Sequence, residues 1–145
     1  MSIQSIGVIG AGQMGNGIAH VFAQSGFNVL MQDISADFVS KGLATIGKNL
    51  QRGVDKGKMA PEEKDAVLGR IRTTTSLDDF KEVDLVVEAA TEKWEIKQQI
   101  FETLDRVCKP GVILASNTSS ISITKLAAAT KRPEAFIGMH FMNPV

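Results

Sequence analysis

The sequence predicts an α/β fold in which helices cover both faces of a parallel sheet. Short apolar runs alternate with longer amphipathic segments along the chain, which is typical of consecutive strand–helix–strand units. The run over residues 84–90 is nearly continuous in apolar residues, as central parallel strands are. Three glycines, Gly10, Gly12 and Gly15, follow the first apolar run at the spacing G-x-G-x-x-G. Together these observations predict a Rossmann-type, doubly wound sheet with right-handed crossovers.

Length and charge indicate one domain that binds small molecules. The chain has 145 residues, so we expect a single domain over residues 1–145. Its 16 basic and 16 acidic residues give a formal net charge of zero. This balance favours neither a nucleic-acid partner nor an anionic membrane surface.

The single cysteine and the uncharged first segment indicate the cellular compartment of the protein. Cys108 is the only cysteine and cannot form an internal disulfide, and no Cys/His cluster has the spacing of a metal site. Residues 1–32 carry no charge, but polar residues and glycines interrupt them, so we expect a buried strand and helix rather than a signal peptide or membrane span. The sequence therefore predicts a cytoplasmic protein without a bound metal.

The first strand, within residues 6–9, leads into a helix expected over residues 13–25. Gly10 would permit the tight turn, Gly12 would leave room for a diphosphate, and Gly15 would let the helix lie close to the sheet. The first turn of that helix offers N–H groups and a positive dipole end to an anion. The alternative is a glycine-rich turn with a purely structural role.

The helix over residues 13–25 should face the sheet through one apolar stripe. Its members are Met14, Ile18, Val21 and Phe22. Gly26 stands where the helix should stop, and His20 falls off the stripe, so we expect it on the solvent side.

A second strand over residues 27–32 ends at Asp33, roughly 20 residues after the glycines. A carboxylate at this position accepts hydrogen bonds from the free ribose hydroxyls of NAD and repels the 2′-phosphate of NADP. The sequence therefore predicts NAD as the cofactor. The alternative is that Asp33 only caps the next helix.

A helical hairpin is predicted between the second and third strands. The long helix over residues 36–56 has an apolar face formed by Val39, Leu43, Ile46, Leu50 and Val54. A second helix should begin at Pro61, with Ala66, Val67, Leu68 and Ile71 as its apolar members. The opposite face of the long helix is basic, with Lys41, Lys48, Arg52 and Lys56. Lys48 and Arg52 either meet a phosphorylated part of a substrate or form a solvated surface.

The rest of the chain continues the alternation. Strands are expected over residues 72–76, 84–90, 112–116 and 135–141, and helices over residues 94–108 and 121–130. The helix over residues 94–108 should bury Ile96, Ile100, Leu104 and Val107. Ligands of doubly wound sheets bind at the carboxyl ends of the strands. The predicted site therefore combines residues 10–15, 33, 90–93, 116–120 and 140–143.

His140 is the candidate acid/base at this edge. Oxidation of an alcohol by a nicotinamide cofactor requires a group that takes the hydroxyl proton, and imidazole titrates near neutral pH. The polar cluster at residues 116–120 and Asn143 are its expected neighbours. The alternative is that His140 packs structurally and the serines form a turn.

Four motifs make the chain similar to a known family. The segments over residues 10–15, 87–92 with Lys97, 116–120 and 138–145 closely resemble those of the 3-hydroxyacyl-CoA dehydrogenases, most like the bacterial 3-hydroxybutyryl-CoA dehydrogenases. The resemblance implies hydride transfer between NAD and the 3-hydroxyl or 3-keto carbon of an acyl-CoA. It also implies that the hairpin over residues 36–71 meets the CoA phosphates.

The resemblance also assigns roles to residues. His140 would be the acid/base, and Ser119 would touch both substrate and cofactor. The expected catalytic residues are His140, Ser119 and Asn143. The expected cofactor-binding residues are Gly10, Gly12, Gln13, Met14, Gly15, Asp33, Ala90, Glu92, Lys97, Asn117, Ser119 and Asn143. The expected substrate-binding residues are Ser119, Lys48 and Arg52.

Two departures from the family pattern set further expectations. Met142 stands where the family usually has a phenylalanine, which is a volume-tolerant apolar change. The chain ends at Val145, whereas the family places a histidine-orienting glutamate and an all-helical, dimer-forming domain further on. We therefore expect an amino-terminal cofactor domain with little activity alone, from an enzyme that is a homodimer when complete.

Two other functions fit the same glycine motif. The β-hydroxyacid dehydrogenases share the glycine loop but use a lysine beyond this range. A non-catalytic NAD-binding module that senses the cofactor or docks a partner is the second alternative.

Overall fold

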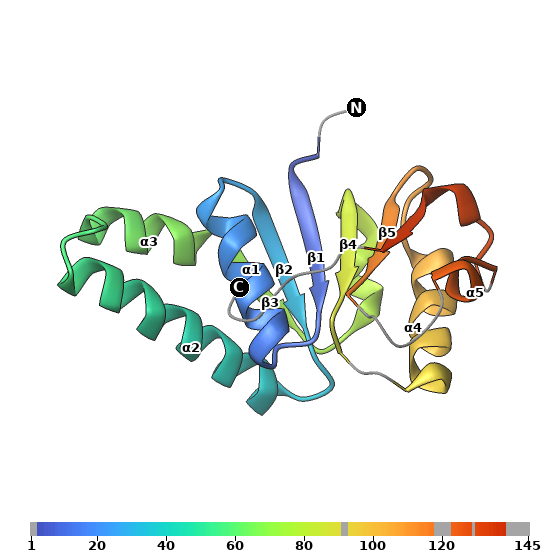
Figure 1. Cartoon of the computed structure of the whole chain (residues 1–145), viewed down its shortest axis with the longest axis horizontal. Coiled ribbons are helices and arrows are strands. Elements are labelled where there is room, and N and C mark those ends of the chain that lie inside the picture. Colours follow the sequence, from blue (N-terminus) through green and yellow to red (C-terminus); the bar gives the residue numbers. More distant parts are fainter. Residues whose placement is uncertain (1–2, 91–92, 118–122, 129, 139–145) are drawn as a thin grey trace.

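A parallel sheet forms the middle layer of the protein in the computed structural model, which describes residues 3–90, 93–117, 123–128 and 130–138. Six strands of these residues lie in the order β3-β2-β1-β4-β5-β6, and every neighbouring pair is parallel. The strands are β1 (Ser5–Ile9), β2 (Asn28–Gln32), β3 (Ile71–Thr74), β4 (Leu85–Glu88), β5 (Ile113–Ser116) and β6 (Phe136–Gly138). The order reverses between β1 and β4, which lie side by side at the centre (Figure 1). The predicted doubly wound Rossmann-type sheet is confirmed.

Helices cover both faces of this sheet. The α-helices are α1 (Gln13–Gln24), α2 (Ala36–Asp55), α3 (Pro61–Gly69), α4 (Trp94–Val107) and α5 (Ile123–Ala128), and the 3₁₀ turns are η1 (Leu77–Glu82) and η2 (Pro133–Ala135). Apolar residues of α1, α2 and α3 pack against one face in a single cluster. Residues of η1, α4 and α5 form a second cluster on the other face.

Strand β1 shows how the alternation of side chains builds the two clusters. Ile6 and Val8 belong to the cluster under α1, and Ile9 belongs to the cluster under α4. Gly7 lies on the second face as well, because a Cβ there would come within 2.7 Å of the Phe80 ring. Both faces of β1 are therefore buried, as the central position of the strand requires.

The buried face of α1 differs from the expected stripe. Val21 is 39% exposed, whereas the small residues Gly15, Ala19 and Ala23 are buried beside Ile18. The small side chains let the helix axis approach the sheet closely, so they, and not the larger Val21, face it. The placement of Val21 in the core was thus wrong.

Two expectations at the end of α1 can also be compared with the structure. His20 is half-buried rather than fully on the solvent side, and this burial lowers the pKa of its imidazole. Gly26 has a φ of 102°, so it stops the helix in the left-handed conformation that glycine favours.

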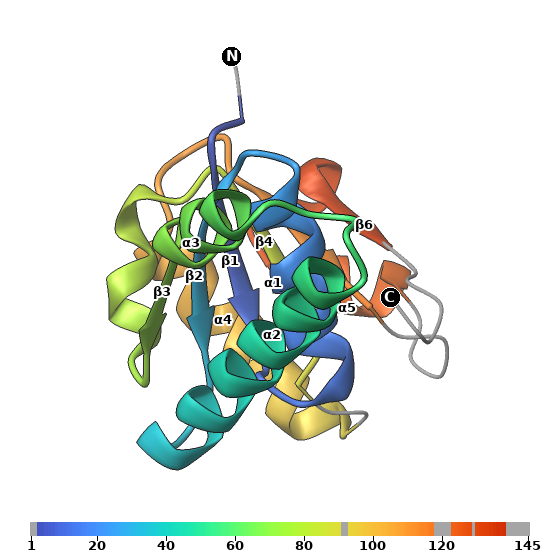
Figure 2. The same cartoon turned by 90° about the vertical axis from the view of Figure 1, so that its left-hand side faces the viewer.

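The predicted hairpin after β2 is formed by α2 and α3. Ser35 caps α2 by accepting a hydrogen bond from the amide of Phe38, and Pro61 opens α3. The pair projects beyond the sheet, and the perpendicular view places it over one face (Figures 1 and 2). Ile71 is the first residue of β3 rather than part of α3, and Ala66 is exposed.

Helix α4 buries most of the predicted face: Leu104 is in the core, and Ile100 and Val107 pack against it. The prediction was wrong for Ile96, which is 42% exposed, and it missed the buried Lys97 and Phe101. The η1 turn, whose Phe80 is buried, was not predicted because the segment is short and rich in acidic residues. Helix α5 and strand β6 are observed within the predicted ranges 121–130 and 135–141. Part of each range lies outside the described residues.

None of the helices in the described part of the chain is long and apolar enough to span a membrane.

Candidate functional site

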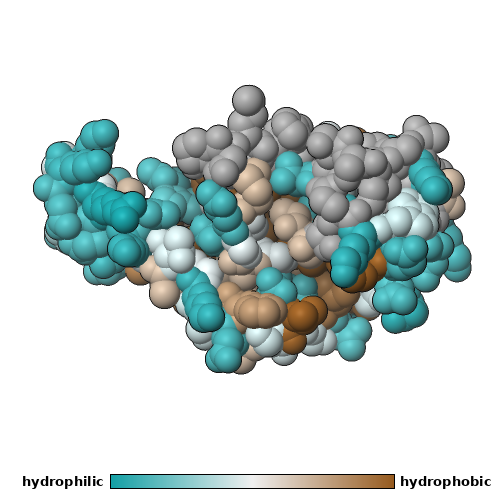
Figure 3. Space-filling view, turned by 60° about the horizontal axis from the view of Figure 1, so that its bottom comes forward, coloured by the Kyte–Doolittle hydropathy of each residue, from teal (hydrophilic) through white to brown (hydrophobic). Residues whose placement is uncertain are grey.

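The carboxyl ends of the strands meet at one edge of the sheet, and the glycine loop after β1 lies there. Figure 3 looks onto this edge, where apolar side chains gather next to polar ones. Because β1 and β4 are neighbours at the point where strand order reverses, a crevice is expected between the segments that follow them.

Gly10 and Gly15 are required by the fold itself. Gly10 has a φ of 105°, and a Cβ there would lie 2.8 Å from the carbonyl oxygen of Ala89. A Cβ at Gly15 would lie only 1.8 Å from the carbonyl oxygen of Gly10. Both positions therefore exclude a side chain, as the sequence predicts.

Gly12 has no such structural reason to be glycine. Its φ of −71° and ψ of −164° are open to any residue, and a Cβ there would meet no described atom within 4 Å. The protein thus leaves space open beside the loop that its own packing does not use. This space fits a ligand that approaches the backbone closely, such as a diphosphate.

The start of α1 completes an anion-binding arrangement. Gly12 occupies the N-cap position without a side chain to cap the helix, and the described first turn contains no acidic residue. Gln13 and Met14 open the helix at this point. The positive end of the helix dipole therefore faces the open space beside Gly12.

Asp33 lies directly beside the glycine loop. One carboxylate oxygen accepts a hydrogen bond of 2.9 Å from the amide of Ala11, and the other accepts one of 2.7 Å from the amide of Ile34. The cap of α2 is Ser35, so Asp33 is not the capping residue that the alternative required. Its carboxylate is instead oriented by the hydrogen bond from the Ala11 amide of the glycine loop.

Two adjoining cavities meet at Asp33. One of about 420 Å³ is lined by the glycine loop, and the other of about 490 Å³ lies toward α4. Asp33, Ile34 and Ala90 line both of them. A ligand that fills both cavities would therefore pass the Asp33 carboxylate at its middle.

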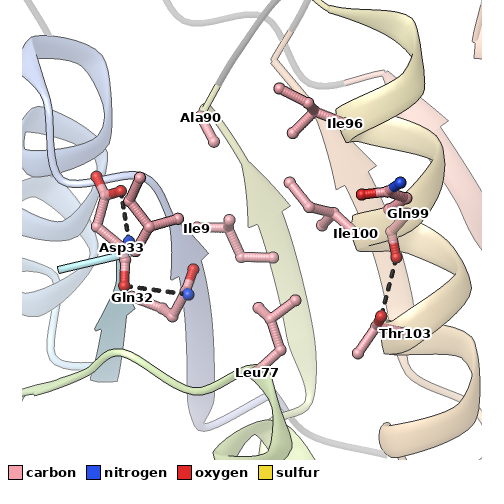
Figure 4. A pocket seen from close by; sticks show the side chains of 10 residues that line it. Ile9, Gln32, Asp33, Leu77, Ala90, Ile96, Gln99, Ile100 and Thr103 are labelled. Carbon is pink, nitrogen blue, oxygen red and sulfur yellow. Dashed lines mark hydrogen bonds between the residues drawn. The ribbon is translucent and has the colours of Figure 1, made fainter.

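The second cavity is mainly apolar. Ile9, Leu77 and Ile100 line it, and Figure 4 shows the α4 residues facing β1 and Asp33 across it. Ile34 is 81% exposed and Ile96 is 42% exposed, although both are large and apolar. A flat aromatic ring between these side chains would explain their exposure.

Behind Ala90, a buried ionic network joins β4, α4 and β5. The ammonium of Lys97 and the carboxylate of Glu88 form an ion pair, and both side chains are fully buried. The same carboxylate accepts hydrogen bonds of 2.8 Å from the Ser116 hydroxyl and from the amide of Ala90. The network therefore fixes the start of the segment that follows β4.

Comparison with known proteins shows which family has this arrangement. Residues 5–145 match the family described as 3-hydroxyacyl-CoA dehydrogenase, NAD binding domain. The chain belongs to this family. The NAD predicted from the glycines and Asp33 is thereby confirmed at the level of the family.

Named relatives agree with this family. The chain is 58% identical over 143 residues to a 3-hydroxybutyryl-CoA dehydrogenase of Bradyrhizobium diazoefficiens, covering 99% of this chain and 49% of that protein. It is 48% identical to a probable 3-hydroxybutyryl-CoA dehydrogenase of Bacillus subtilis, covering 100% of this chain and 50% of that protein. The chain thus spans about half the length of the curated relatives it matches.

A solved structure has nearly the same backbone. The crystal structure of (S)-3-hydroxybutyryl-CoA dehydrogenase PaaH1 from Ralstonia eutropha superposes with a TM-score of 0.97 at 52% identity. The match covers 99% of this chain and 51% of that one. The family match favours the 3-hydroxyacyl-CoA dehydrogenases over the β-hydroxyacid dehydrogenases.

Lys97 and Asn117, two of the predicted cofactor-binding residues, lie among the described residues. Lys97 was expected to contact the nicotinamide half of the cofactor, and the structure places its ammonium in the buried pair with Glu88. Asn117 is half-buried, and its backbone N–H donates a hydrogen bond of 2.8 Å to the backbone carbonyl oxygen of Glu88. Both residues therefore lie next to the end of β4.

The basic residues of α2 divide into two groups. Lys41 lines the cavity at the glycine loop, which was not predicted. Lys48 and Arg52 are exposed further along the helix, and the Arg52 guanidinium lies 3.5 Å from the side-chain oxygen of Asn49. Lys48 and Arg52 are therefore accessible to a large anionic substrate.

Four predicted site residues lie outside the described residues: Glu92, Ser119, His140 and Asn143. Sequence reasoning missed the cavity residues Ile34, Ile96 and Leu77, because an apolar residue beside a helix or strand is first assigned to the core. The signal that could have found Ile34 is its position directly after Asp33.

Proposed function

We propose that residues 1–145 form the cofactor domain of an NAD-dependent 3-hydroxyacyl-CoA dehydrogenase that acts on 3-hydroxybutyryl-CoA. The observation that carries this proposal is the open space at Gly12, adjoining a carboxylate that lies between two cavities. The relatives are 3-hydroxybutyryl-CoA dehydrogenases, which supports an acyl-CoA substrate.

The cavities suggest how the dinucleotide would lie. Its diphosphate would face the loop at Gly12 and the start of α1, with the Lys41 ammonium as a further cation. The adenosine ribose would lie at Asp33, and the adenine ring would enter the apolar cavity beside Ile96. Because a carboxylate repels a 2′-phosphate, NAD is preferred over NADP.

The chemistry at the substrate follows from the resemblance. Bound NAD would supply the hydride acceptor. His140 would take the proton of the 3-hydroxyl group in oxidation and return it in reduction, while Ser119 would hold the substrate oxygen. Asn143 and Glu92 would orient the nicotinamide half, with Lys97 supporting it beside Glu88.

The projecting α2–α3 hairpin would meet the CoA part of the substrate. Lys48 and Arg52 are exposed cations on α2, and CoA carries several phosphate charges. Replacing both residues should raise the KM for the acyl-CoA and leave the affinity for NADH unchanged. An unchanged KM would assign them to a solvated surface.

The chain by itself should bind NADH but turn over slowly, because relatives are about twice as long. The test combines NADH binding with acetoacetyl-CoA-dependent NADH oxidation on one sample. We expect saturable binding and a turnover more than about tenfold below that of a full-length relative. Turnover within that factor would refute the expectation.

A matched variant separates an enzyme from a non-catalytic module. His140→Asn should leave NADH affinity intact and remove the residual acetoacetyl-CoA-dependent oxidation. If residual oxidation persists in the variant, His140 is not the acid/base. A parent chain that binds NADH without any oxidation would fit both a binding module and the cofactor domain of a longer enzyme, and the same variant made in the complete protein would then separate them.

We also propose a cytoplasmic homodimer for the complete enzyme. The buried free thiol of Cys108 fits a reducing compartment. Fractionation of cells and light scattering on the complete protein test the two statements separately.

A further inference from the structure

Gln32 is a buried polar residue at the second cavity. It is the last residue of β2, is 6% exposed and lines the cavity of about 490 Å³. A polar side chain in this position carries a desolvation cost unless its atoms find partners. The NH2 group of its side-chain amide has hydrogen-bond partners within the protein.

Two carbonyl oxygens fix the orientation of that amide. The Nε2 group donates hydrogen bonds of 3.2 Å to the carbonyl oxygens of Asp33 and Thr75. Because a carbonyl oxygen cannot donate, the amide nitrogen must face this pair and the amide oxygen must face the other way. The direction of the Gln32 side chain therefore follows from the backbone around it.

The amide oxygen of Gln32 is an acceptor presented to the cavity. No N–H or O–H group of the described residues donates to Oε1. No fully buried side-chain oxygen or nitrogen in the described part lacks a partner, so Oε1 must be reachable from the cavity. Figure 4 shows this oxygen turned away from the Asp33 bond and into the space lined by Ile9 and Leu77.

We infer that the side-chain oxygen of Gln32 accepts a hydrogen bond from the exocyclic amino group of adenine. This inference rests on the proposed function, because it takes the ligand to be an adenine dinucleotide. The cavity offers apolar walls for a flat ring, and the Gln32 oxygen is a buried acceptor beside Ile9 and Leu77, which together fit a planar group with an N–H donor on its edge. Hypoxanthine carries a carbonyl oxygen at that position, and two facing acceptors repel each other.

The experiment compares two reduced cofactors on the unmodified chain. NADH and its hypoxanthine analogue share the nicotinamide, both riboses and the diphosphate, so their affinity ratio reports on the 6-position and the adjoining N1 of the base. Fluorescence titration should show NADH binding about tenfold more tightly. Equal affinities would overturn the inference while leaving NAD binding intact, whereas the absence of saturable NADH binding would overturn the proposed function and this inference with it.

Two matched variants locate the effect. Gln32→Met removes the acceptor and should bring the affinity ratio close to one. Gln99→Met makes the same change at an exposed residue on α4 that lines the same cavity, and it should keep the ratio. An unchanged ratio in Gln32→Met would assign Gln32 a purely structural role.

Loss of stability in Gln32→Met would not obscure the result. The variant also loses the bonds to Asp33 and Thr75, which should weaken both cofactors alike because both carry the same ribose. The ratio is insensitive to that shared loss. A thermal melt shows whether the variant folds, and the comparison on the parent chain stands without it.

Discussion

The carboxylate of Asp33 is hydrogen-bonded to the amide of Ala11 at 2.9 Å, so the end of β2 holds the glycine loop after β1 in place. The second carboxylate oxygen is held by the amide of Ile34. Asp33 therefore has a structural role even without a ligand. A ribose bound there would meet a carboxylate whose direction is already set.

Asp33→Asn should test the charge at this position. The Asn side chain keeps an oxygen that can accept from the Ala11 amide, but it loses the charge and the acceptor for the Ile34 amide. We expect the affinity for NADH to fall about tenfold and the preference over NADPH to shrink. Titration with both cofactors measures this, with Asp37→Asn, exposed in the first turn of α2, as the matched control. An unchanged preference for NADH in Asp33→Asn would show that the carboxylate does not set cofactor choice.

Gly15→Ala should destabilise the protein, because its Cβ would overlap the carbonyl oxygen of Gly10. Gly47→Ala in the interior of α2 is the matched control, since a Cβ there meets no described atom within 4 Å. The control should raise the free energy of unfolding by about 0.5–1 kcal/mol. Urea titration of both variants decides the matter, and equal stability of the two would contradict the close approach of α1 to the loop.

Lys97→Met should be strongly destabilising, because it leaves the buried Glu88 carboxylate without its cation. The expected loss is about 3–5 kcal/mol in the free energy of unfolding. The double variant Glu88→Gln with Lys97→Met should recover much of it, since the Gln oxygen can still accept from the Ala90 amide while its NH2 group donates to the Ser116 hydroxyl oxygen. No recovery in the double variant would argue against the ion pair as the source of the effect.

Asp84 should contribute a pH-dependent part of the stability. The Lys109 ammonium, 2.7 Å away, and the amides of Gln4 and Ser5 lower the pKa of Asp84 to about 2. Because the folded-state pKa lies below the ordinary value of 3.8, the stabilisation is complete above that value and is lost as the pH falls toward 2. The difference in Tm between the parent and Asp84→Asn should therefore be constant from pH 7 to about pH 5 and shrink below about pH 4. A difference that stays constant down to pH 3 would contradict this assignment.

The Cys108 thiol should be unreactive in the folded protein. Burial raises its pKa to about 11, so very little thiolate is present near neutral pH. We expect a disulfide reagent at pH 8 to label the thiol only after denaturant is added. Rapid labelling without denaturant would show that the end of α4 opens readily.

The sequence predicted the parts of the fold that local chemistry determines. Gly10 and Gly15 follow from close approaches near the loop, and the α2–α3 hairpin follows from a long amphipathic pattern that ends before Pro61. It failed where the surroundings of a residue depend on how the helices and strands pack together. Lys97 is buried only because Glu88 and Ser116 come beside it in the sheet, and Ile96 is exposed only because it borders a cavity.

Titration of the chain with NADH, beside the variant Gly12→Val, tests the central claim most directly. A Cβ at this position would enter space that the described protein leaves open, so the variant should still fold. We expect saturable NADH binding by the parent and at least about tenfold weaker binding by the variant. A parent chain that does not saturate, or a variant that binds as tightly as the parent, would contradict a dinucleotide seated over the glycine loop.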